Sequence, residues 1–173
     1  MKRLLHERFA EQARRTPEAV ALRHRERVLT CGALEADAAR IAGALIARDV
    51  APGAVVGLHL ERSLEQVAAV LGILKSGAAV LPLPPAFPAA RQRQILDCAS
   101  PALEIDTDLT GLSSGRSGRN VLPVESLLSE ASSVAVDPPS LDEEAIAFVL
   151  SSSGSTGRAK LLARSHRSFF HRL

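Results

Sequence analysis

The feature that most constrains the fold is an apolar pattern that changes from strand spacing to helix spacing and back. VVGLHL (55–60) and AAVLPL (78–83) are apolar runs of strand length. Between them, apolar residues recur at helical spacing from Leu64 to Leu74. A strand, a helix and a strand within about 30 residues predict a βαβ unit, whose two strands lie parallel and are joined by a right-handed crossover.

The helix of this unit has a signal at each end. Ser63 and Gln66 have the spacing of a capping box, in which each side chain bonds the backbone N–H of the other residue. Gly77 follows the last turn, where glycine commonly caps a helix C-terminus. Both signals place the helix between the two predicted strands.

Helices and strands also alternate along the rest of the chain. The polar HRER between the apolar segments 19–22 and 28–30 predicts a hairpin. Pro88 suits the first position of a helix. The other expected elements are helices at 4–14, 32–48, 88–98 and 125–131 and strands at 102–106, 121–124 and 146–150. This alternation predicts an α/β fold with a mostly parallel sheet flanked by helices.

Two segments lack periodicity, and the length of the chain favours one domain over residues 1–173. Residues of about 107–120 are predicted to form an exposed, flexible loop, and residues of about 132–142 a connector. The connector ends in the acidic residues 142–144. A solvated helix start is favoured for them over a metal site, because acidic residues stabilise the first turn of a helix.

Composition excludes several classes of function. The 21 basic and 19 acidic residues nearly balance and form no basic cluster, so nucleic-acid binding is not expected. Cys31 and Cys98 are too few for a disulfide framework or a zinc site. No apolar run approaches the roughly 20 residues of a membrane helix, and the N-terminus lacks the apolar core of a signal peptide. A soluble, cytoplasmic protein without a bound metal is expected. The histidines at 6, 24, 59 and 171 share no ligand spacing and are expected to be solvated or packed.

The segment SSSGSTG (151–157), which follows the apolar IAFVL (146–150) and precedes Lys160, leaves two interpretations open. Composition alone favours a flexible linker, because tracts of glycine and serine are flexible coil. Position favours a ligand loop. IAFVL is typical of a strand buried within a sheet, and ligands of open α/β sheets bind just beyond the carboxyl ends of strands.

The chemistry of the segment suits phosphate. Glycines allow close approach of the backbone, and successive N–H groups can line an anion-binding concavity. Lys160 adds a compact positive charge. The spacing fits neither the Walker pattern, which would require glycine in place of Ala159, nor the dinucleotide pattern, which would require it in place of Thr156. The hydroxyl donors are Ser152, Ser153, Ser155 and Thr156, and the glycines are Gly154 and Gly157.

Several segments resemble one family. SSSGSTGRAK resembles the phosphate-loop signature of adenylate-forming (AMP-binding) enzymes, Thr-Ser-Gly-Ser-Thr-Gly-x-Pro-Lys-Gly. FAEQARRTPEAVAL resembles the opening of the adenylation domains of nonribosomal peptide synthetases. LTCGALEADAARIAGAL and LERSLEQVAAVLGILKSGAAVLPLPP are similar to their first and second core segments. Because the matches follow the family's order, residues 1–173 are identified as the N-terminal part of the adenylate-forming fold.

The resemblance implies a reaction. Such domains use ATP and Mg²⁺ to convert a carboxylic acid, here an amino or aryl acid, into an acyl-adenylate and pyrophosphate. The acyl group then passes to coenzyme A or to the phosphopantetheine of a carrier protein. By resemblance, Ser152 through Gly157 close over the β- and γ-phosphates, and Lys160 neutralises their charge. His166 stands where the family often has histidine, and a helix-capping or surface role is favoured over a contact with the nucleotide.

The chain also departs from the family pattern. Ala159 and Leu161 replace the usual proline and glycine, tyrosine is absent, and KLLARSH is more similar to aryl-acid ligases. The family's acyl pocket, ribose-binding aspartate and C-terminal lysine lie downstream of the matched segments. The resemblance therefore implies a truncated domain that has no catalytic residue of its own and is inactive alone. The alternative is a non-catalytic remnant, or a subunit that binds the missing remainder of a split enzyme.

Overall fold

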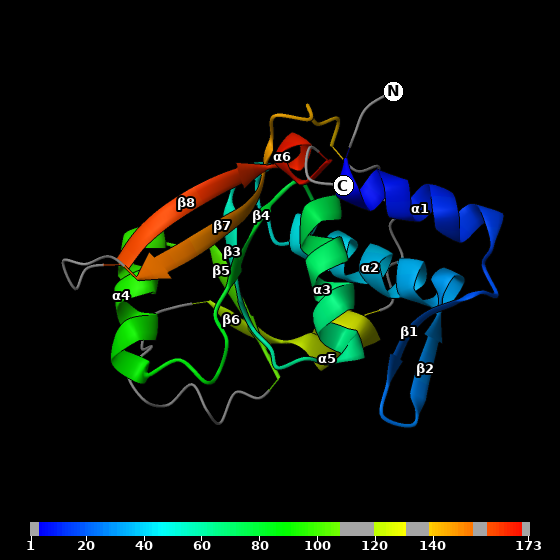
Figure 1. Cartoon of the computed structure of the whole chain (residues 1–173), viewed down its shortest axis with the longest axis horizontal. Helices are drawn as coiled ribbons and strands as arrows, with labels where there is room; N and C mark the ends of the chain where they lie inside the picture. Colours follow the sequence, from blue (N-terminus) through cyan, green and yellow to red (C-terminus); the bar gives the residue numbers. More distant parts are fainter. Residues whose placement is uncertain (1–3, 108–119, 131–138, 154–158, 171–173) are drawn as a thin grey trace.

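A central sheet with helices on both faces forms the body of the molecule, and a separate two-stranded hairpin lies beside it (Figure 1). The computed structural model of the chain describes residues 4–107, 120–130, 139–153 and 159–170. No helix in these four ranges is long and apolar enough to span a membrane. The predicted α/β class is confirmed.

The six strands of the sheet have the order β6-β5-β3-β4-β7-β8. The strands from β6 to β7 are parallel to their neighbours, and β8 is antiparallel to β7. The mostly parallel sheet expected from the sequence is therefore confirmed. The bounds are Val55–His59 for β3, Ala79–Pro82 for β4, Leu103–Asp106 for β5, Val121–Pro123 for β6, Ile146–Ser153 for β7 and Ala159–Ser165 for β8.

The predicted βαβ unit is present as β3, α3 (Leu64–Lys75) and β4. Ser63 caps α3, because its Oγ accepts the backbone N–H of Gln66 at 3.0 Å. The predicted second bond of the capping box, from the Ser63 backbone N–H to the Gln66 side chain, is wrong: Gln66 Nε2 donates to the Leu60 carbonyl at 2.9 Å. This bond ties the start of the helix to the chain leaving β3. Gly77 ends the helix with a φ of 87°, as predicted for its cap.

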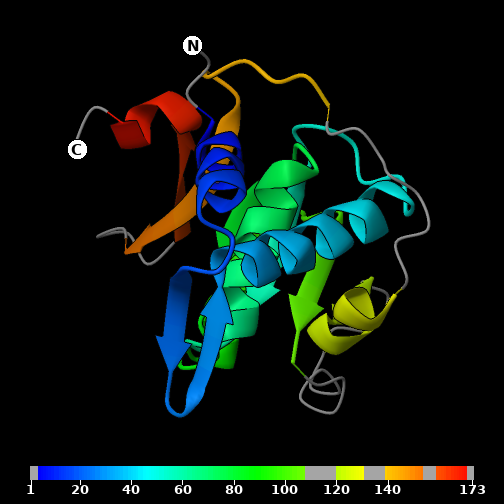
Figure 2. The same cartoon turned by 90° about the vertical axis from the view of Figure 1, so that its right-hand side faces the viewer.

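Three helices cover one face of the sheet: α2 (Cys31–Ile46), α3 and α5 (Val124–Ser129) (Figure 2). α2 and α3 approach closely at Gly72. A Cβ atom there would lie 2.6 Å from Ile41 Cβ, so no larger residue fits without a shift of the helices. The fully buried Ile41 and Ile73 belong to the main core that this packing creates.

The opposite face is covered by α4 (Ala89–Ala99). Its buried Ile95 and Leu96 form a second core with Val149 of β7, against which Leu161 of β8 also packs. Pro88 is the N-cap residue of α4 and not its first helical residue, so the predicted start is wrong by one position.

The two ends of the described chain meet above the sheet. α1 (Leu5–Arg15) lies beside α6 (His166–Phe170) (Figure 1). The Leu5 N–H donates to His166 Nδ1 at 3.2 Å. The predicted hairpin follows α1 as β1 (Val20–His24) and β2 (Arg27–Thr30), which pair antiparallel.

Other expectations from the sequence are corrected or lie outside the described residues. The acidic residues 142–144 form a turn before β7, because Asp142 Oδ1 accepts the Glu144 N–H at 2.9 Å; the predicted helix start is wrong. Most of the predicted loop (108–119) and of the predicted connector (132–138) lies outside the described residues.

Candidate functional site

The candidate phosphate loop connects the two strands of the β7–β8 hairpin. The sequence predicted that this strand ends at Leu150. Instead, β7 continues through Ser153, because β8 pairs with it along this stretch. Ser152 lies opposite Lys160, and Ser153 lies opposite Ala159. The remaining predicted site residues, Gly154, Ser155, Thr156 and Gly157, lie outside the described residues. Of the predicted set, the structure therefore places Ser152, Ser153 and Lys160 around the base of this connection.

Ser152 and Lys160 project from the same face of the hairpin. Residues directly opposite each other in an antiparallel pair share a face, and their Cβ atoms are about 5 Å apart. Ser152 is half-buried and Lys160 is exposed. A residue with a hydroxyl and a residue with an ammonium group thus lie opposite each other, one pair before the end of the described hairpin. Both donate hydrogen bonds, which suits an anionic ligand.

The same face continues as apolar surface toward the middle of the hairpin. Leu150 and Leu162 are the next cross-strand pair and remain 36% and 51% exposed. Ile146, at the other end of β7, is 42% exposed. The prediction that IAFVL is buried within the sheet is therefore right in part: Ala147 and Val149 are buried, whereas Ile146 and Leu150 are not.

Arg91 contacts the site from the opposite face of the sheet. Its Nη2 donates to the Ser152 carbonyl at 2.7 Å, which joins the first turn of α4 to the end of β7. Arg91 was not predicted from the sequence, because 61 residues separate it from Ser152 and no local pattern joins them.

His166 does not contribute to this site. It is 1% exposed, begins α6 and caps the N-terminus of α1 through the Leu5 N–H. Burial lowers the pKa of His166. His6 packs edge-on against it with ring centroids 5.6 Å apart. Burial lowers the pKa of His6 to about 4, with smaller contributions from His166 and Lys75. The capping role favoured from the sequence is confirmed, and the surface role is wrong.

A second buried polar pair lies within the sheet. His59 Nε2 and Glu104 Oε2 are 2.7 Å apart, and both side chains are almost fully buried. They come from the adjacent strands β3 and β5. His59 is thus one of the packed histidines that the sequence allowed. Because both side chains are buried between these strands, the pair stabilises the sheet and does not form part of a surface site.

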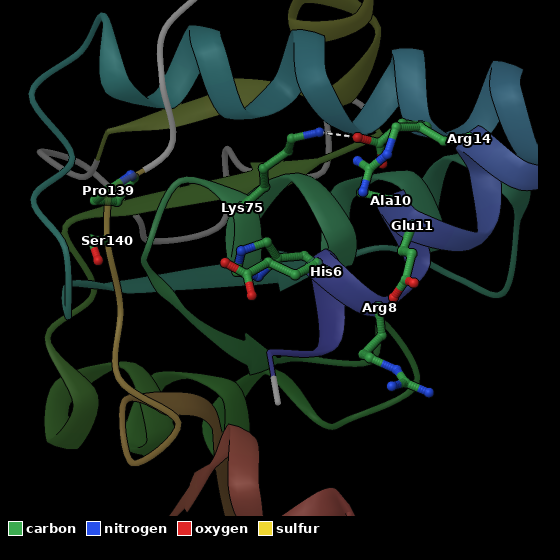
Figure 3. A pocket seen from close by; sticks show the side chains of 10 residues that line it. His6, Arg8, Ala10, Glu11, Arg14, Lys75, Pro139 and Ser140 are labelled. Carbon is green, nitrogen blue, oxygen red and sulfur yellow. Dashed lines mark hydrogen bonds and ion pairs between the residues drawn. The ribbon is translucent and has the colours of Figure 1, made fainter. Parts of the chain in front are cut away.

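A cavity lies away from the paired ends of β7 and β8. Its volume is about 610 Å³, and its wall is formed mainly by α1, with Glu35 and Lys75 from α2 and α3 (Figure 3). Glu35 and Lys75 form an ion pair with each other. Pro139 and Ser140 close another side. Because charges of both signs line the cavity, it lacks the concentration of donors that a polyphosphate requires.

Comparison with known proteins supports the resemblance seen in the sequence. The sequence profile described as "AMP-binding enzyme" matches residues 9–173. The chain is 34% identical over 171 residues to nonribosomal peptide synthetase 8 of Aspergillus fumigatus, and 35% identical over 168 residues to malpinin synthetase of Mortierella alpina. These matches cover 97% and 94% of this chain but 2% of each relative, so the chain spans only a small part of those proteins.

Solved structures show the same fold. The N-terminal subdomain of NpsA from Klebsiella oxytoca, in complex with 3-hydroxyanthranilyl-AMSN, superposes with a TM-score of 0.85 at 27% identity. The match covers 96% of this chain and 41% of that chain. The nonribosomal peptide synthetase FmoA3 in its AMPPNP-bound form matches with a TM-score of 0.85 at 33% identity, over 96% of this chain and 18% of that chain. The expected fold, the N-terminal portion of an adenylate-forming enzyme, is confirmed.

Proposed function

Because the chain belongs to the AMP-binding enzyme family, we propose that residues 1–173 form the N-terminal part of a domain that activates a carboxylic acid with ATP. The observation that carries this proposal is the cross-strand pair of Ser152 and Lys160 at the base of the glycine- and serine-rich connection. A hydroxyl and a cation at the two ends of such a loop can hold the two ends of a polyphosphate.

The proposed role of the loop is to bind the β- and γ-phosphates of ATP. When the carboxylate attacks the α-phosphate, pyrophosphate leaves and negative charge grows on its oxygens. Hydrogen-bond donors and a cation that are already in place stabilise this charge without reorganisation. Ser152 Oγ and Lys160 Nζ supply these groups from the described part of the chain, and the donors from Ser153 to Gly157 complete the set. Mg²⁺ would enter with the phosphates of ATP.

The proposed substrate is an amino acid or an aryl acid. The relatives of the peptide synthetase type favour an amino acid, whereas the 3-hydroxyanthranilyl group bound by the NpsA subdomain favours an aryl acid. The proposed acceptor of the acyl group is a thiol, either of coenzyme A or of a carrier protein's phosphopantetheine. In the family, the residues that select the acid follow the segments matched here.

We further propose that residues 1–173 do not catalyse the reaction alone. A second candidate, a subunit that completes a split enzyme, is favoured by the exposed apolar face of the hairpin. The cross-strand pair Leu150 and Leu162 is 36% and 51% exposed, and Ile146 is 42% exposed. Apolar surface exposed in this way is typical of an interface. Both candidates require the rest of an adenylation domain to cover this face.

ATP–pyrophosphate exchange tests the proposal. The 173-residue chain is expected to show no exchange with a panel of amino and aryl acids. Exchange is expected after addition of a polypeptide that supplies the rest of an adenylation domain. Exchange by the chain alone would contradict the proposed dependence, and no exchange by the completed domain would contradict the proposed function.

Replacement of Lys160 tests the site itself. In the completed domain, Lys160→Ala is expected to slow exchange on the order of a hundredfold, because one stabilising group for the leaving pyrophosphate is lost. Arg23→Ala is the control, since Arg23 is also an exposed cation on a strand but lies on the separate β1–β2 hairpin. Equal rates for the Lys160 and Arg23 variants would refute the role of Lys160.

A further inference from the structure

We propose that Arg91 is the positioning residue of Ser152 at the end of β7, because its guanidinium bonds the Ser152 carbonyl from α4. The inference rests on the proposed function only for the nature of the ligand, a polyphosphate. The mechanical role of Arg91 follows from the geometry of β7 and α4.

β7 loses its neighbour on one side before it reaches the candidate site. It pairs with β8 along its whole length, from Ile146 to Ser153. On its other side, β7 pairs with β4. Within the described chain this pairing involves one residue of β7, Phe148, which lies opposite Val80. Among the described residues, strand pairing therefore holds the end of β7 from the β8 side.

Where a strand has a neighbour on one side alone, the backbone N–H and C=O groups on its other side need hydrogen-bond partners from elsewhere. In an antiparallel pair, alternate residues direct their N–H and C=O groups toward the partner strand, and the residues between them direct these groups away. A carbonyl without a partner is unfavourable unless another donor reaches it. The Ser152 carbonyl accepts from Arg91 Nη2 at 2.7 Å. Arg91 thus supplies a charged side-chain donor to the backbone at the end of β7.

The position of Arg91 is itself fixed by packing. It lies in the first turn of α4, where its N–H donates to the Pro88 carbonyl at 2.8 Å. One turn later, Ile95 and Leu96 are 0% and 1% exposed against β7 and β8. A rigid helix therefore carries the guanidinium to the strand end. A bond from a fixed helix limits the movement of the Ser152 backbone more than a bond from a mobile side chain would.

This restraint acts directly on the candidate site. Ser152 is the residue opposite Lys160, so its backbone sets where the hydroxyl stands relative to the ammonium group. Preorganised donors are effective only if they already stand where the charge will be. The bond also places a permanent positive charge next to the backbone that leads into the connection.

Three variants separate positioning from general stability. Arg91→Met keeps the apolar stem and removes every donor. Arg91→Lys restores one charged donor. Arg93→Met is the matched control, because Arg93 is an exposed arginine on the same helix, two residues away. Thermal unfolding of each variant checks that the fold is intact.

The first measurement needs no ligand. Amide hydrogen exchange of the 173-residue chain, followed in peptides that cover β7 and β8, reports how firmly the strand end is held. Arg91→Met is expected to speed exchange about tenfold in the C-terminal half of β7, with little change at its N-terminal half. Arg91→Lys is expected to reverse part of this change, and Arg93→Met to match the wild type.

The second measurement is binding of inorganic tripolyphosphate and of ATP to the same chain by titration calorimetry. Arg91→Met is expected to weaken both affinities about tenfold, the effect of losing one hydrogen bond from a charged group. Arg91→Lys is expected to regain part of the loss. In the completed domain, Arg91→Met is expected to raise the KM for ATP more than it lowers kcat.

The two measurements distinguish the failure of this inference from the failure of the proposed function. Unchanged hydrogen exchange in Arg91→Met overturns the inference, whatever the chain binds. Unchanged polyphosphate affinity in Arg91→Met, with a wild-type chain that binds, also overturns it. If the wild-type chain and the completed domain bind no polyphosphate, the proposed function fails, and faster exchange in Arg91→Met alone still supports the restraint of β7.

Discussion

At the scale of single residues, two pairs of buried polar side chains in the described chain have different roles. His59 and Glu104 bond each other inside the sheet. His6 and His166 join α1 to the C-terminal end of the described chain. Their lowered pKa values mean that both histidines are neutral in the folded protein near pH 7. The contact between α1 and α6 should therefore depend on pH.

We predict that the free energy of unfolding falls as the pH is lowered from about 6.5 to about 4. The pKa of His6 is about 4 in the folded chain, against an ordinary value of 6.5. Between these values the unfolded chain binds more protons, so acid favours unfolding, by up to about 3 kcal/mol for this residue. Denaturant titrations of the wild type and of His6→Leu across this range measure the effect.

The variant serves as the control for this prediction. His6→Leu cannot titrate at this position, so its stability should change less between pH 6.5 and 4 than that of the wild type. Carboxylates and His166 titrate in both proteins, so their contributions largely cancel in the difference. Parallel curves for the two proteins would show that burial of His6 does not couple folding to pH.

At the scale of secondary-structure elements, the close contact of α2 with α3 depends on one glycine. A Cβ at Gly72 would meet Ile41 Cβ and Cγ2 at 2.6 Å, inside the main core. Backbone and side chain would both have to shift, since interiors are close-packed. The sheet lies directly beneath these helices, so the strain would spread into the core.

We predict that Gly72→Ala lowers the free energy of unfolding by about 1–3 kcal/mol, the usual cost of overpacking a core. Ile41→Ala also destabilises the protein, because it leaves a cavity. Combined, the two changes should cost less than the sum of the single changes, since the smaller residue at 41 makes room for the new methyl group. Urea denaturation of the three variants measures this coupling. Additive losses would mean that Gly72 and Ile41 do not interact as the structure shows.

The elements that the sequence predicted correctly are those with a strong local signal. The helical spacing of α2 and α3, the cap at Ser63 and the positive φ at Gly77 all depend on neighbouring residues. β8 was missed because AKLLARS does not alternate regularly between apolar and polar residues. Pairing with β7 holds this segment as a strand, and such pairing is a property of two segments together.

The candidate site was predictable only in part for the same reason. Lys160 and the hydroxyls of the loop were predicted from the composition of the segment and from its resemblance to the family's signature. Their arrangement across a hairpin depends on the register between β7 and β8, which no local sequence pattern predicted. Arg91 reaches the site through α4, so only the three-dimensional packing shows it.

At the scale of the whole molecule, the proposed function assigns the open face of the hairpin to contact with another part of an adenylation domain. Leu150 and Leu162 form an exposed apolar pair next to the candidate site. A charge at either position should oppose burial at an interface, because an unpaired charge is costly to remove from water.

We predict that Leu162→Glu abolishes the pyrophosphate exchange restored by a completing polypeptide, while the isolated chain remains folded. The side chain is 51% exposed, so the change should alter the stability of the chain by about 0.5 kcal/mol or less. Val28→Glu, at a similarly exposed apolar position on the distant hairpin, is the control. Equal exchange in both variants would show that the open face of β7 and β8 takes no part in the contact.

The proposed function depends most on the binding of a nucleotide's polyphosphate at Ser152 and Lys160. A crystal structure of the completed domain with ATP and Mg²⁺ tests this directly. We predict β- and γ-phosphate oxygens about 3 Å from Ser152 Oγ and Lys160 Nζ, within hydrogen-bond distance. Phosphates bound elsewhere, such as in the cavity beside α1, with no contact to either residue, would contradict it.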